Sequence, residues 1–343
     1  MAVQARRSRA PVRAASRATG GAAAGSRGAG RAAVPERGSL YEEVTARVIA
    51  EMEAGRFPWV QPWSGTAAQP CLPRNAASGR PYSGINVLIL WGEAIARGYS
   101  GQGWLTFRQA LASGGGVRKG ERGVTICYAD RFTPERERER AVAEGGEPGS
   151  VAFLKRFTVF NTDQIDWGDN PRPAFAVEPP PLPEREIVPI GEALIAATGA
   201  DFRIGGAEAY YSPAFDYVQV PPQPAFPHQV DYYRTATHEL GHWTGHRSRL
   251  ARDQSGAFGT ALYAREELVA ELSAAFVCAT LGIEPNVRHA DYLASWLAVL
   301  RADDRAIFKA ASLAAKSADY LLGFLADPAA DAVQASSFEE MAA

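Results

Sequence analysis

Apolar residues between positions 40 and 52 recur at the three- and four-residue spacing of one helix face. Ser39 precedes them and Glu42 follows three residues after it, which is the pattern of a helix-capping box. The same spacing predicts a second helix over 85–98. A short third helix is expected over 106–113, closed by three consecutive glycines. An ordered domain therefore begins at residue 39.

Two later stretches are rich in β-branched and aromatic residues and predict strands, over 124–128 and 151–160. The residues at 134–149, between these strands, are dense in charge and glycine. Arginine and glutamate alternate from 135 to 140. We interpret the segment as a solvated excursion of a hairpin.

A proline-rich stretch divides the chain. Residues 169–189 contain seven prolines, a composition typical of a semi-rigid extended linker. Beyond it, the pattern predicts a helix over 187–198 and short strands over 202–204, 207–211 and 217–220. The remaining predicted elements are helices, at about 231–245, 264–281, 289–301 and 304–322.

These elements predict an α+β fold with two domains, each combining helices with a small sheet. The expected divisions are a disordered basic arm at 1–38, a first domain at 39–168, a proline-rich linker at 169–186, a second domain at 187–325 and a polar tail at 326–343.

Charge is distributed unevenly along the chain. Residues 1–38 carry eight arginines and one acidic residue, a net charge of +7, so the other 305 residues carry −9. The arm has almost no large apolar side chain and cannot bury a core. An arm that grips phosphates and an extension without a role are equally compatible with this composition. An organelle transit peptide shares the arginine-rich composition, but the arm lacks a clear amphipathic pattern.

The three cysteines are far apart in the sequence and odd in number. This excludes a disulfide framework and fits a reducing cytosol. No apolar run is long enough to span a bilayer. We therefore expect a cytoplasmic protein without a membrane partner; its oligomeric state is left open.

The candidate chemistry is concentrated in one predicted helix. His238 and His242 lie four residues apart in an H-E-x-x-H pattern, so both imidazoles share a helix face and can bind one zinc ion, or another divalent metal. Glu239 would face the open position of the metal, where a carboxylate can take a proton from bound water. Four of the five histidines fall within nineteen residues, which favours a single site.

A catalytic zinc site needs a third protein ligand. The next predicted helix carries Glu266, Glu267 and Glu271 near its start. We expect Glu267 to be the ligand and Glu271 to orient a histidine by a hydrogen bond, an arrangement similar to that of gluzincins. A helical wheel does not separate Glu266 from Glu267. Solvated acidic residues at a helix start are the alternative interpretation.

His246 lies eight residues after the first histidine of the motif, whereas a metzincin places its third histidine ten residues on. It could replace a ligand if the helix ended at Gly245, but we favour a helix-end residue or a transition-state donor; Tyr263 is a second candidate donor. Gly241 and Gly245 each cost a helix about 1 kcal/mol relative to alanine, so we expect them to permit close packing against the Glu-bearing helix. The strand at 217–220 is expected to be the edge strand that aligns a peptide substrate.

The motifs together resemble those of ArdC-type antirestriction proteins. The resemblance covers about residues 39–325 and implies a single-stranded-DNA-binding N-terminal domain, shared with plasmid TraC-type primases, and a zincin-like metallopeptidase domain. The arm and the charged segment at 134–149 lie outside it. The matching motifs are HELGHWTGHRSRL at 238–250, YAREELVAE at 263–271, SGRPYSGIN at 78–86, VRKGERG at 117–123 and FTVFNTDQ at 157–164.

Single-stranded DNA binds to proteins through aromatic stacking platforms beside positive charge. The first domain interleaves both kinds of residue, although core aromatic residues and solvated bases would explain the pattern equally well without the resemblance. The candidate DNA contacts are Trp59, Trp63, Arg74, Arg80, Tyr82, Trp104, Arg118, Lys119, Lys155 and Phe157.

The leading hypothesis is an ArdC-like antirestriction protein that binds single-stranded DNA, carries a zinc metallopeptidase domain and protects incoming DNA from restriction. One alternative is a cytosolic regulatory metallopeptidase that cleaves a partner protein. Another is a DNA-binding protein whose zincin half is a non-catalytic scaffold. The intact Glu239 disfavours the last, because a structural metal site needs no general base.

Overall fold

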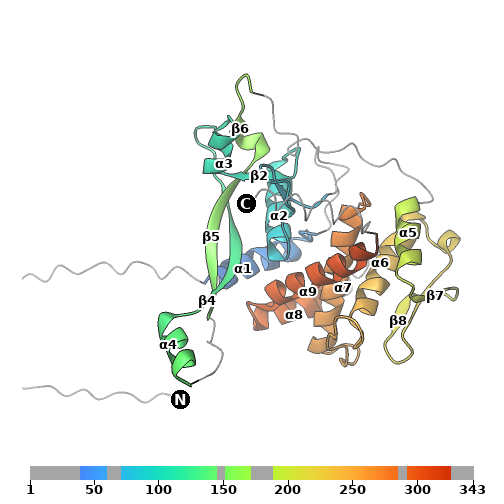
Figure 1. The fold of residues 1–343 in the computed structure, drawn as a ribbon. Coiled ribbons are helices and arrows are strands. Elements are labelled where there is room, and N and C mark those ends of the chain that lie inside the picture. The colour runs from blue at the N-terminus through green and yellow to red at the C-terminus, as the bar shows by residue number, and fades with distance from the viewer. Residues whose placement is uncertain (1–38, 60–70, 145–150, 171–187, 285–291, 326–343) are drawn as a thin grey trace, which may run out of the picture. The chain divides into compact units, whose positions relative to one another are not determined.

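The computed structural model describes residues 39–59, 71–144, 151–170, 188–284 and 292–325. The described residues belong to one unit, and Figure 1 shows the order of their elements.

Several predicted segments lie outside the described residues. These are the basic arm at 1–38, the tail at 326–343 and the linker from residue 171 onward.

The N-terminal elements are built around a four-stranded sheet of order β1-β2-β5-β4. Strand β5 runs antiparallel to both of its neighbours, while β1 runs parallel to β2. A two-stranded sheet pairs β3 with β6. The elements are α1 (Leu40–Glu53), β1 (Arg74–Asn75), α2 (Ile85–Arg97), β2 (Gly103–Thr106), α3 (Phe107–Ala112), β3 (Gly116–Val117), β4 (Val124–Phe132), α4 (Glu135–Glu144), β5 (Val151–Asn161) and β6 (Ile165–Asp166).

The predicted start of the first helix is confirmed by its cap. Ser39 Oγ accepts a hydrogen bond from the backbone N–H of Glu42 at 3.1 Å, and the Glu42 side chain accepts one from the backbone N–H of Ser39 at 2.7 Å. These two bonds satisfy donors that a helix start otherwise leaves open.

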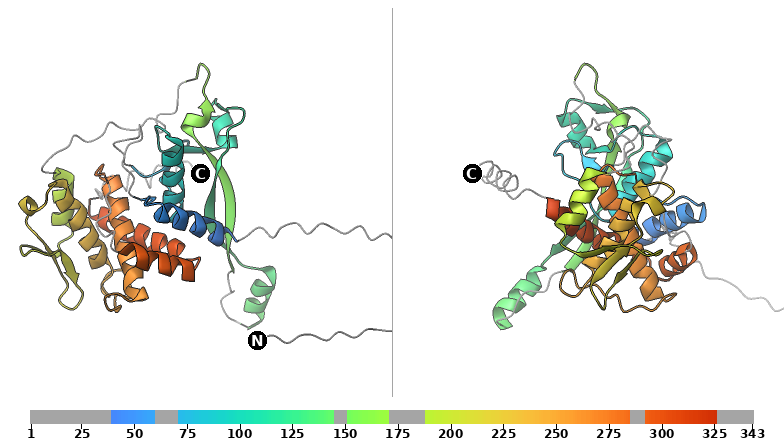
Figure 2. Two further views of the ribbon diagram at one scale, coloured as in Figure 1. Left: turned by 180° about the vertical axis from the view of Figure 1, so that it is seen from behind. Right: turned by 90° about the vertical axis from the view of Figure 1, so that its right-hand side faces the viewer.

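The charged segment between β4 and β5 differs from its prediction. We expected a solvated hairpin excursion over 134–149, but its first part is the helix α4, which lies at the end of the β4–β5 ribbon (Figure 2). Arginine and glutamate are good helix formers, and their alternation brings opposite charges one turn apart. Arg140 and Glu137 form such a pair at 2.8 Å. Residues 145–150 lie outside the described part.

Strand β4 lies at the edge of the sheet, where an unpaired strand would expose its backbone groups. Asn86 of α2 covers one position of this edge. Its side-chain amide donates to the carbonyl of Cys127 at 2.7 Å and its carbonyl accepts from the N–H of Cys127 at 2.8 Å.

The C-terminal elements begin with a short helix and a three-stranded sheet of order β7-β9-β8, followed by helices. The elements are α5 (Pro189–Ala197), β7 (Asp201–Ile204), β8 (Tyr210–Ser212), β9 (Tyr217–Val220), α6 (Val230–Thr244), α7 (Ala261–Thr280), α8 (Leu293–Ala302) and α9 (Ala306–Leu322). The prediction that 217–220 forms the edge strand is wrong. Strand β9 pairs with both neighbours, and β8 is the edge strand beside α6.

The core joins both halves of the described chain. Helices α6, α7 and α9 pack against one another (Figure 1). Helix α1 packs against α8 and places Tyr41 edge-on to Phe308 of α9, with ring centroids 4.6 Å apart. Thr45 Oγ1 donates to the carbonyl of Asp304 at 2.6 Å. One continuous apolar cluster therefore includes residues from both predicted domains.

The described part of the chain contains no helix that is both long and apolar enough to cross a membrane. Its three cysteines, Cys71, Cys127 and Cys278, are free thiols and all buried.

Candidate metal centre

Helix α6 carries the H-E-x-x-H residues on a face that the fold buries. His238 and Glu239 are both buried, and His242 is half-buried at the cleft. Helix α7 packs along this face over the residues that follow its cap, where Thr260 Oγ1 accepts from the N–H of Tyr263 at 3.2 Å. The site is therefore formed between two helices rather than on one.

Gly241 sets the distance between these helices. A Cβ at this position would lie 3.4 Å from both the Cα and the carbonyl oxygen of Ala270, and 3.4 Å from Cβ of Ser273. The predicted role of Gly241 in close packing against the Glu-bearing helix agrees with this geometry. Gly245 has a different neighbourhood, because it faces the side chains of Arg252 and Gln254 instead of α7.

Glu267 is the carboxylate that faces both histidines. Its Oε2 lies 3.6 Å from Nε2 of His238, and its Oε1 lies 3.5 Å from Nε2 of His242. One donor atom from each of the three residues lies within 4.8 Å of the other two. The structure thus separates Glu267 from Glu266, which the helical wheel alone could not do.

The spacing of these atoms fits a divalent metal ion. Nitrogen and oxygen ligands bind zinc at about 2.0–2.2 Å, so neighbouring donors of a tetrahedral site lie about 3.4 Å apart. The two nitrogen–oxygen distances of 3.6 and 3.5 Å are close to this value. Two neutral imidazoles and one carboxylate are also a donor set that zinc-like ions prefer.

Each histidine has a second carboxylate at its other ring nitrogen. Glu271 Oε2 lies 3.3 Å from Nδ1 of His238, and Glu266 Oε1 lies 3.3 Å from Nδ1 of His242. Carboxylates in this position fix the orientation of metal-binding imidazoles. The expected position of Glu271 beside a histidine therefore matches the geometry, while the equivalent position of Glu266 was not anticipated.

Glu266 is part of a buried ion pair. Arg252 Nη2 donates to Glu266 Oε1 at 2.8 Å, and Gln254 Nε2 donates to the same oxygen at 2.9 Å. Burial alone would raise the pKa of Glu266, but the hydrogen bonds with His242 and Arg252 outweigh it and lower the pKa to about 2. Sequence reasoning missed Arg252 and Gln254, because nothing in the local pattern distinguishes a buried loop arginine from an exposed one.

Glu239 occupies the position expected of a general base. It lines a cleft of about 430 Å³ together with His238, His242 and Glu267. Burial raises the pKa of Glu239, and the two histidines partly oppose this shift. A backbone hydrogen bond from Tyr211 of the edge strand β8 also reaches this carboxylate.

The two candidate transition-state donors lie in different places. Tyr263 lines the cleft, and its hydroxyl lies 3.2 Å from that of Tyr292. His246 follows the end of α6 and places its Nδ1 2.7 Å from Ser248 Oγ and 3.7 Å from Asp216 Oδ2. It is neither among the residues that could hold the metal nor among those that line the cleft, within the described part of the chain.

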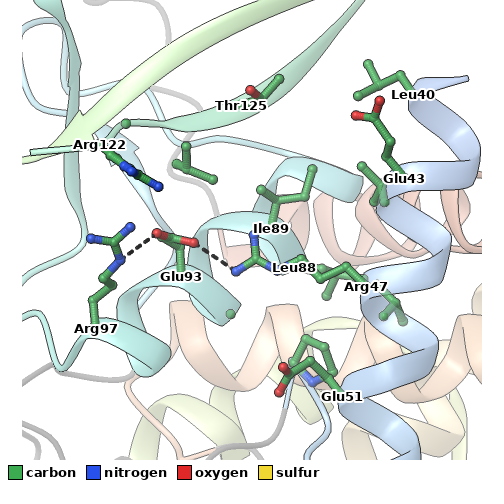
Figure 3. Close-up of a pocket in the computed structure, with 16 residues that line it drawn as sticks. Leu40, Glu43, Arg47, Glu51, Leu88, Ile89, Glu93, Arg97, Arg122 and Thr125 are labelled. Carbon is green, nitrogen blue, oxygen red and sulfur yellow. Dashed lines mark hydrogen bonds and ion pairs between the residues drawn. The ribbon is translucent and has the colours of Figure 1, made fainter. Parts of the chain in front are cut away.

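A second cavity, of about 370 Å³, lies between α1, α2 and β4 (Figure 3). Its floor is apolar, and part of its charged rim is neutralised internally. Glu93 pairs with Arg47 at 2.8 Å and with Arg97 at 3.0 Å. The cavity offers no donor set comparable to that between α6 and α7.

Two of the ten predicted DNA contacts are buried in the core. Trp59 and Trp104 are 0% exposed, so neither ring can stack on a base, and their prediction as stacking platforms is wrong. Both rings fill the core instead. Arg74 and Tyr82 are not fully exposed either, the first being half-buried on β1 and the second packing against the core. Trp63 lies outside the described residues.

The other predicted contacts, Arg80, Arg118, Lys119, Lys155 and Phe157, are exposed. The Arg118 side chain bonds to the carbonyl of Asp163 and to Glu121, so part of its function is to hold a loop.

Tyr128, which forms an exposed aromatic pair with Phe157 on the β4–β5 ribbon, was missed by sequence reasoning. Tyr128 and Phe157 are 52% and 43% exposed, and their ring centroids lie 6.0 Å apart. Lys155 pairs in register with Tyr128, so all three side chains share one face of the ribbon. The alternation of residues along each strand could have indicated this exposed face. Which residues of the two strands share the face, however, depends on the strand register.

Comparisons with known proteins agree with both halves of this architecture. A family model described as the N-terminal domain of anti-restriction factor ArdC matches residues 38–160, and one described as a zincin-like metallopeptidase matches residues 189–313. The uncharacterized protein y4eC of Sinorhizobium fredii is 42% identical over 289 residues, which cover 82% of this chain and 91% of that protein.

Two further relatives extend this picture. The DNA primase TraC of Escherichia coli is 37% identical over 302 residues; these cover 83% of this chain but only 27% of the primase. The antirestriction ArdC protein from the R388 plasmid has been crystallised in metal-free and Mn(II)-bound forms. Both structures share 40% sequence identity with this chain and superpose on it with a TM-score of 0.69. They cover 83% and 84% of this chain and 97% and 99% of their own.

The fold and the ligand set thus define a protein with two domains of mixed helix and sheet, the second a zincin-like metallopeptidase domain that implies a divalent metal. The chain belongs to the ArdC family of antirestriction proteins. The predicted α+β fold class and the resemblance to ArdC-type antirestriction proteins are both confirmed.

The packing at Gly241 predicts different outcomes for two substitutions. Gly241→Ala should leave the thermal unfolding midpoint unchanged or raise it, because a methyl group fits at 3.4 Å and alanine favours a helix by about 1 kcal/mol. Gly241→Leu should lower stability by about 1–3 kcal/mol and reduce the metal bound per chain, because α7 must move away. Calorimetry with elemental analysis measures both. Equal behaviour of the two variants would show that Gly241 does not set the helix separation.

Proposed function

We propose that this chain is an antirestriction protein that binds single-stranded DNA through its N-terminal domain and a zinc ion through His238, His242 and Glu267. The observation that carries the metal assignment is the position of Glu267 across both Nε2 atoms. A related ArdC protein in its Mn(II)-bound form supports a divalent ion, and the imidazole-rich donor set favours zinc.

The chemistry that the site could perform is hydrolysis. A bound divalent ion lowers the pKa of water and polarises a carbonyl group. Glu239 would accept the proton of the attacking water, for which its burial in the cleft and its raised pKa are suited. An extended peptide would lie along the free edge of β8, since Tyr210 and Tyr211 line the same cleft.

The proposed DNA surface is the exposed face of the β4–β5 ribbon. Tyr128 and Phe157 offer ring faces for base stacking, and Lys155 supplies positive charge beside them. Arg80 and Lys119 are further exposed cations on the same domain. The relationship to the DNA primase TraC supports a nucleic-acid partner.

A peptidase that cleaves one partner protein remains a second candidate function. The observation that favours it is the complete set of hydrolytic groups, namely the three ligands and Glu239, in one cleft. DNA shielding alone would not require Glu239.

The metal assignment predicts that two substitutions act differently from a third. His242→Ala and Glu267→Ala should lose the zinc that wild type holds at one ion per chain, because each removes a ligand. Glu239→Gln should keep the ion and lower hydrolysis of a peptide substrate at least ~100-fold, because it removes only the general base. Elemental analysis of the purified variants gives the metal content. Full occupancy in both ligand variants would contradict the assignment.

Glu239→Gln also separates the two candidate functions. Protection of DNA from a restriction enzyme should persist in this variant if occlusion of DNA is the function. Loss of protection with metal and DNA binding intact would instead place the function in proteolysis.

The surface assignment predicts that Phe157→Ala and Tyr128→Ala weaken binding of single-stranded DNA by the full-length protein. Each lost stacking platform should cost about 1–3 kcal/mol. Phe215→Ala is the matched control, because Phe215 is 78% exposed but lies between β8 and β9. Fluorescence anisotropy with a labelled oligonucleotide measures the effect. Undiminished binding by both ribbon variants, or an equal loss in the control, would place the DNA elsewhere.

A further inference from the structure

We propose that Glu266 and Arg252 are positioning residues for the metal ligand His242. Their buried ion pair holds the ring hydrogen of His242 on Nδ1 and leaves Nε2 as the ligand atom. This inference rests on the proposed function, because it requires a metal ion at His238, His242 and Glu267.

The donors around one carboxylate oxygen determine where that hydrogen lies. Glu266 Oε1 accepts from Arg252 Nη2 at 2.8 Å and from Gln254 Nε2 at 2.9 Å, and it lies 3.3 Å from His242 Nδ1. Guanidinium and amide nitrogens only donate. An oxygen that accepts from two such groups acts as an acceptor toward the imidazole as well. The hydrogen therefore belongs to Nδ1, and the lone pair of Nε2 faces Glu267 at 3.5 Å.

Arg252 is anchored to the helix that carries the ligand. Its side chain is 3% exposed. Its Nη1 donates to Thr244 Oγ1 at 2.7 Å, and its Nη2 donates to the carbonyl of Gly241 at 2.6 Å. Its Nε donates to the second oxygen of Glu266 at 3.0 Å. Both carboxylate oxygens are thus held relative to the α6 backbone, from which His242 projects.

Gly245 provides the space for this arrangement. Its φ of −73° and ψ of −12° are ordinary helical values that any residue adopts. A Cβ there would lie 2.5 Å from Gln254 Nε2 and 2.8 Å from Arg252 Nη2. A side chain at this position would therefore meet the two donor groups where they now lie, whereas the backbone conformation itself does not favour glycine.

The two histidines are held in different ways. Among the described residues, Glu271 has no arginine or lysine in an ion pair with it, whereas Glu266 is paired with Arg252. The carboxylate beside His242 therefore orients the ring while its charge is balanced. The Glu266–Arg252 pair therefore acts on the orientation of His242, and it does not simply add negative charge around the metal.

The test compares two substitutions of Glu266 in the full-length protein. Glu266→Gln retains an acceptor oxygen of the same shape and should weaken zinc binding about 10-fold; Glu266→Leu removes the acceptor and should weaken it about 100-fold. Competition with a chromophoric chelator gives the zinc dissociation constants. The visible spectrum of the Co²⁺-loaded variants reports the ligand geometry, which a merely structural role would not change.

Ser317→Ala is the matched control. Ser317 Oγ lies 2.7 Å from both Thr244 Oγ1 and Ser273 Oγ, so it belongs to the same buried network but lies beyond Arg252. The Ser317→Ala substitution should lower the unfolding midpoint of the metal-free protein and leave its zinc affinity unchanged. Wild-type affinity and Co²⁺ spectrum in Glu266→Gln would overturn the inference, even if Glu266→Leu fails to fold. A wild-type chain that binds no divalent metal would instead contradict the proposed function.

Discussion

The close approach of α6 and α7 at Gly241 is the constraint on which the metal centre depends. Two imidazoles on one helix cannot complete a zinc site, and the proposed third ligand comes from a second helix. Glu267 reaches both histidines because α7 packs closely on α6 at Gly241, where a methyl group would already be in contact with Ala270. The packing that builds the core therefore also sets the ligand geometry. A change in the separation of α6 and α7 would therefore disturb the core packing and the ligand geometry together.

A second glycine, directly after α6, gives space to the residues that surround the proposed ligands. Gly245 leaves space at the end of α6 for the side chains of Arg252 and Gln254. The N-terminal half is joined to this region through α1, where Thr45 bonds to the carbonyl of Asp304. The proposed DNA-binding half and the metal-binding half thus share an apolar core. Their activities are best measured in the full-length chain.

The elements with strong periodicity could be predicted from the sequence, as could the helix-borne pair of histidines. Their signals are local: an apolar stripe, a capping box at Ser39, and a four-residue spacing. What failed depends on long-range contacts. The order β7-β9-β8, which makes β8 the edge, is not encoded in the alternation of any one strand. The burial of Trp104 likewise follows only from tertiary packing. Glu267 was expected as the ligand, but its separation from Glu266, which the helical wheel left open, also needs the packing of α7 on α6. Residue type alone does not reveal the buried environment of Arg252.

X-ray absorption at the zinc edge of the metal-loaded wild-type protein tests the proposed ligand set. We expect two imidazole nitrogens and carboxylate oxygen at about 2.0–2.2 Å, with no third imidazole and no sulfur. Glu267→Ala should lose this signature and His246→Ala should retain it, since His246 Nδ1 is directed to Ser248 at 2.7 Å. A third imidazole that disappears in His246→Ala would contradict the ligand set, and with it the role of the α6–α7 packing.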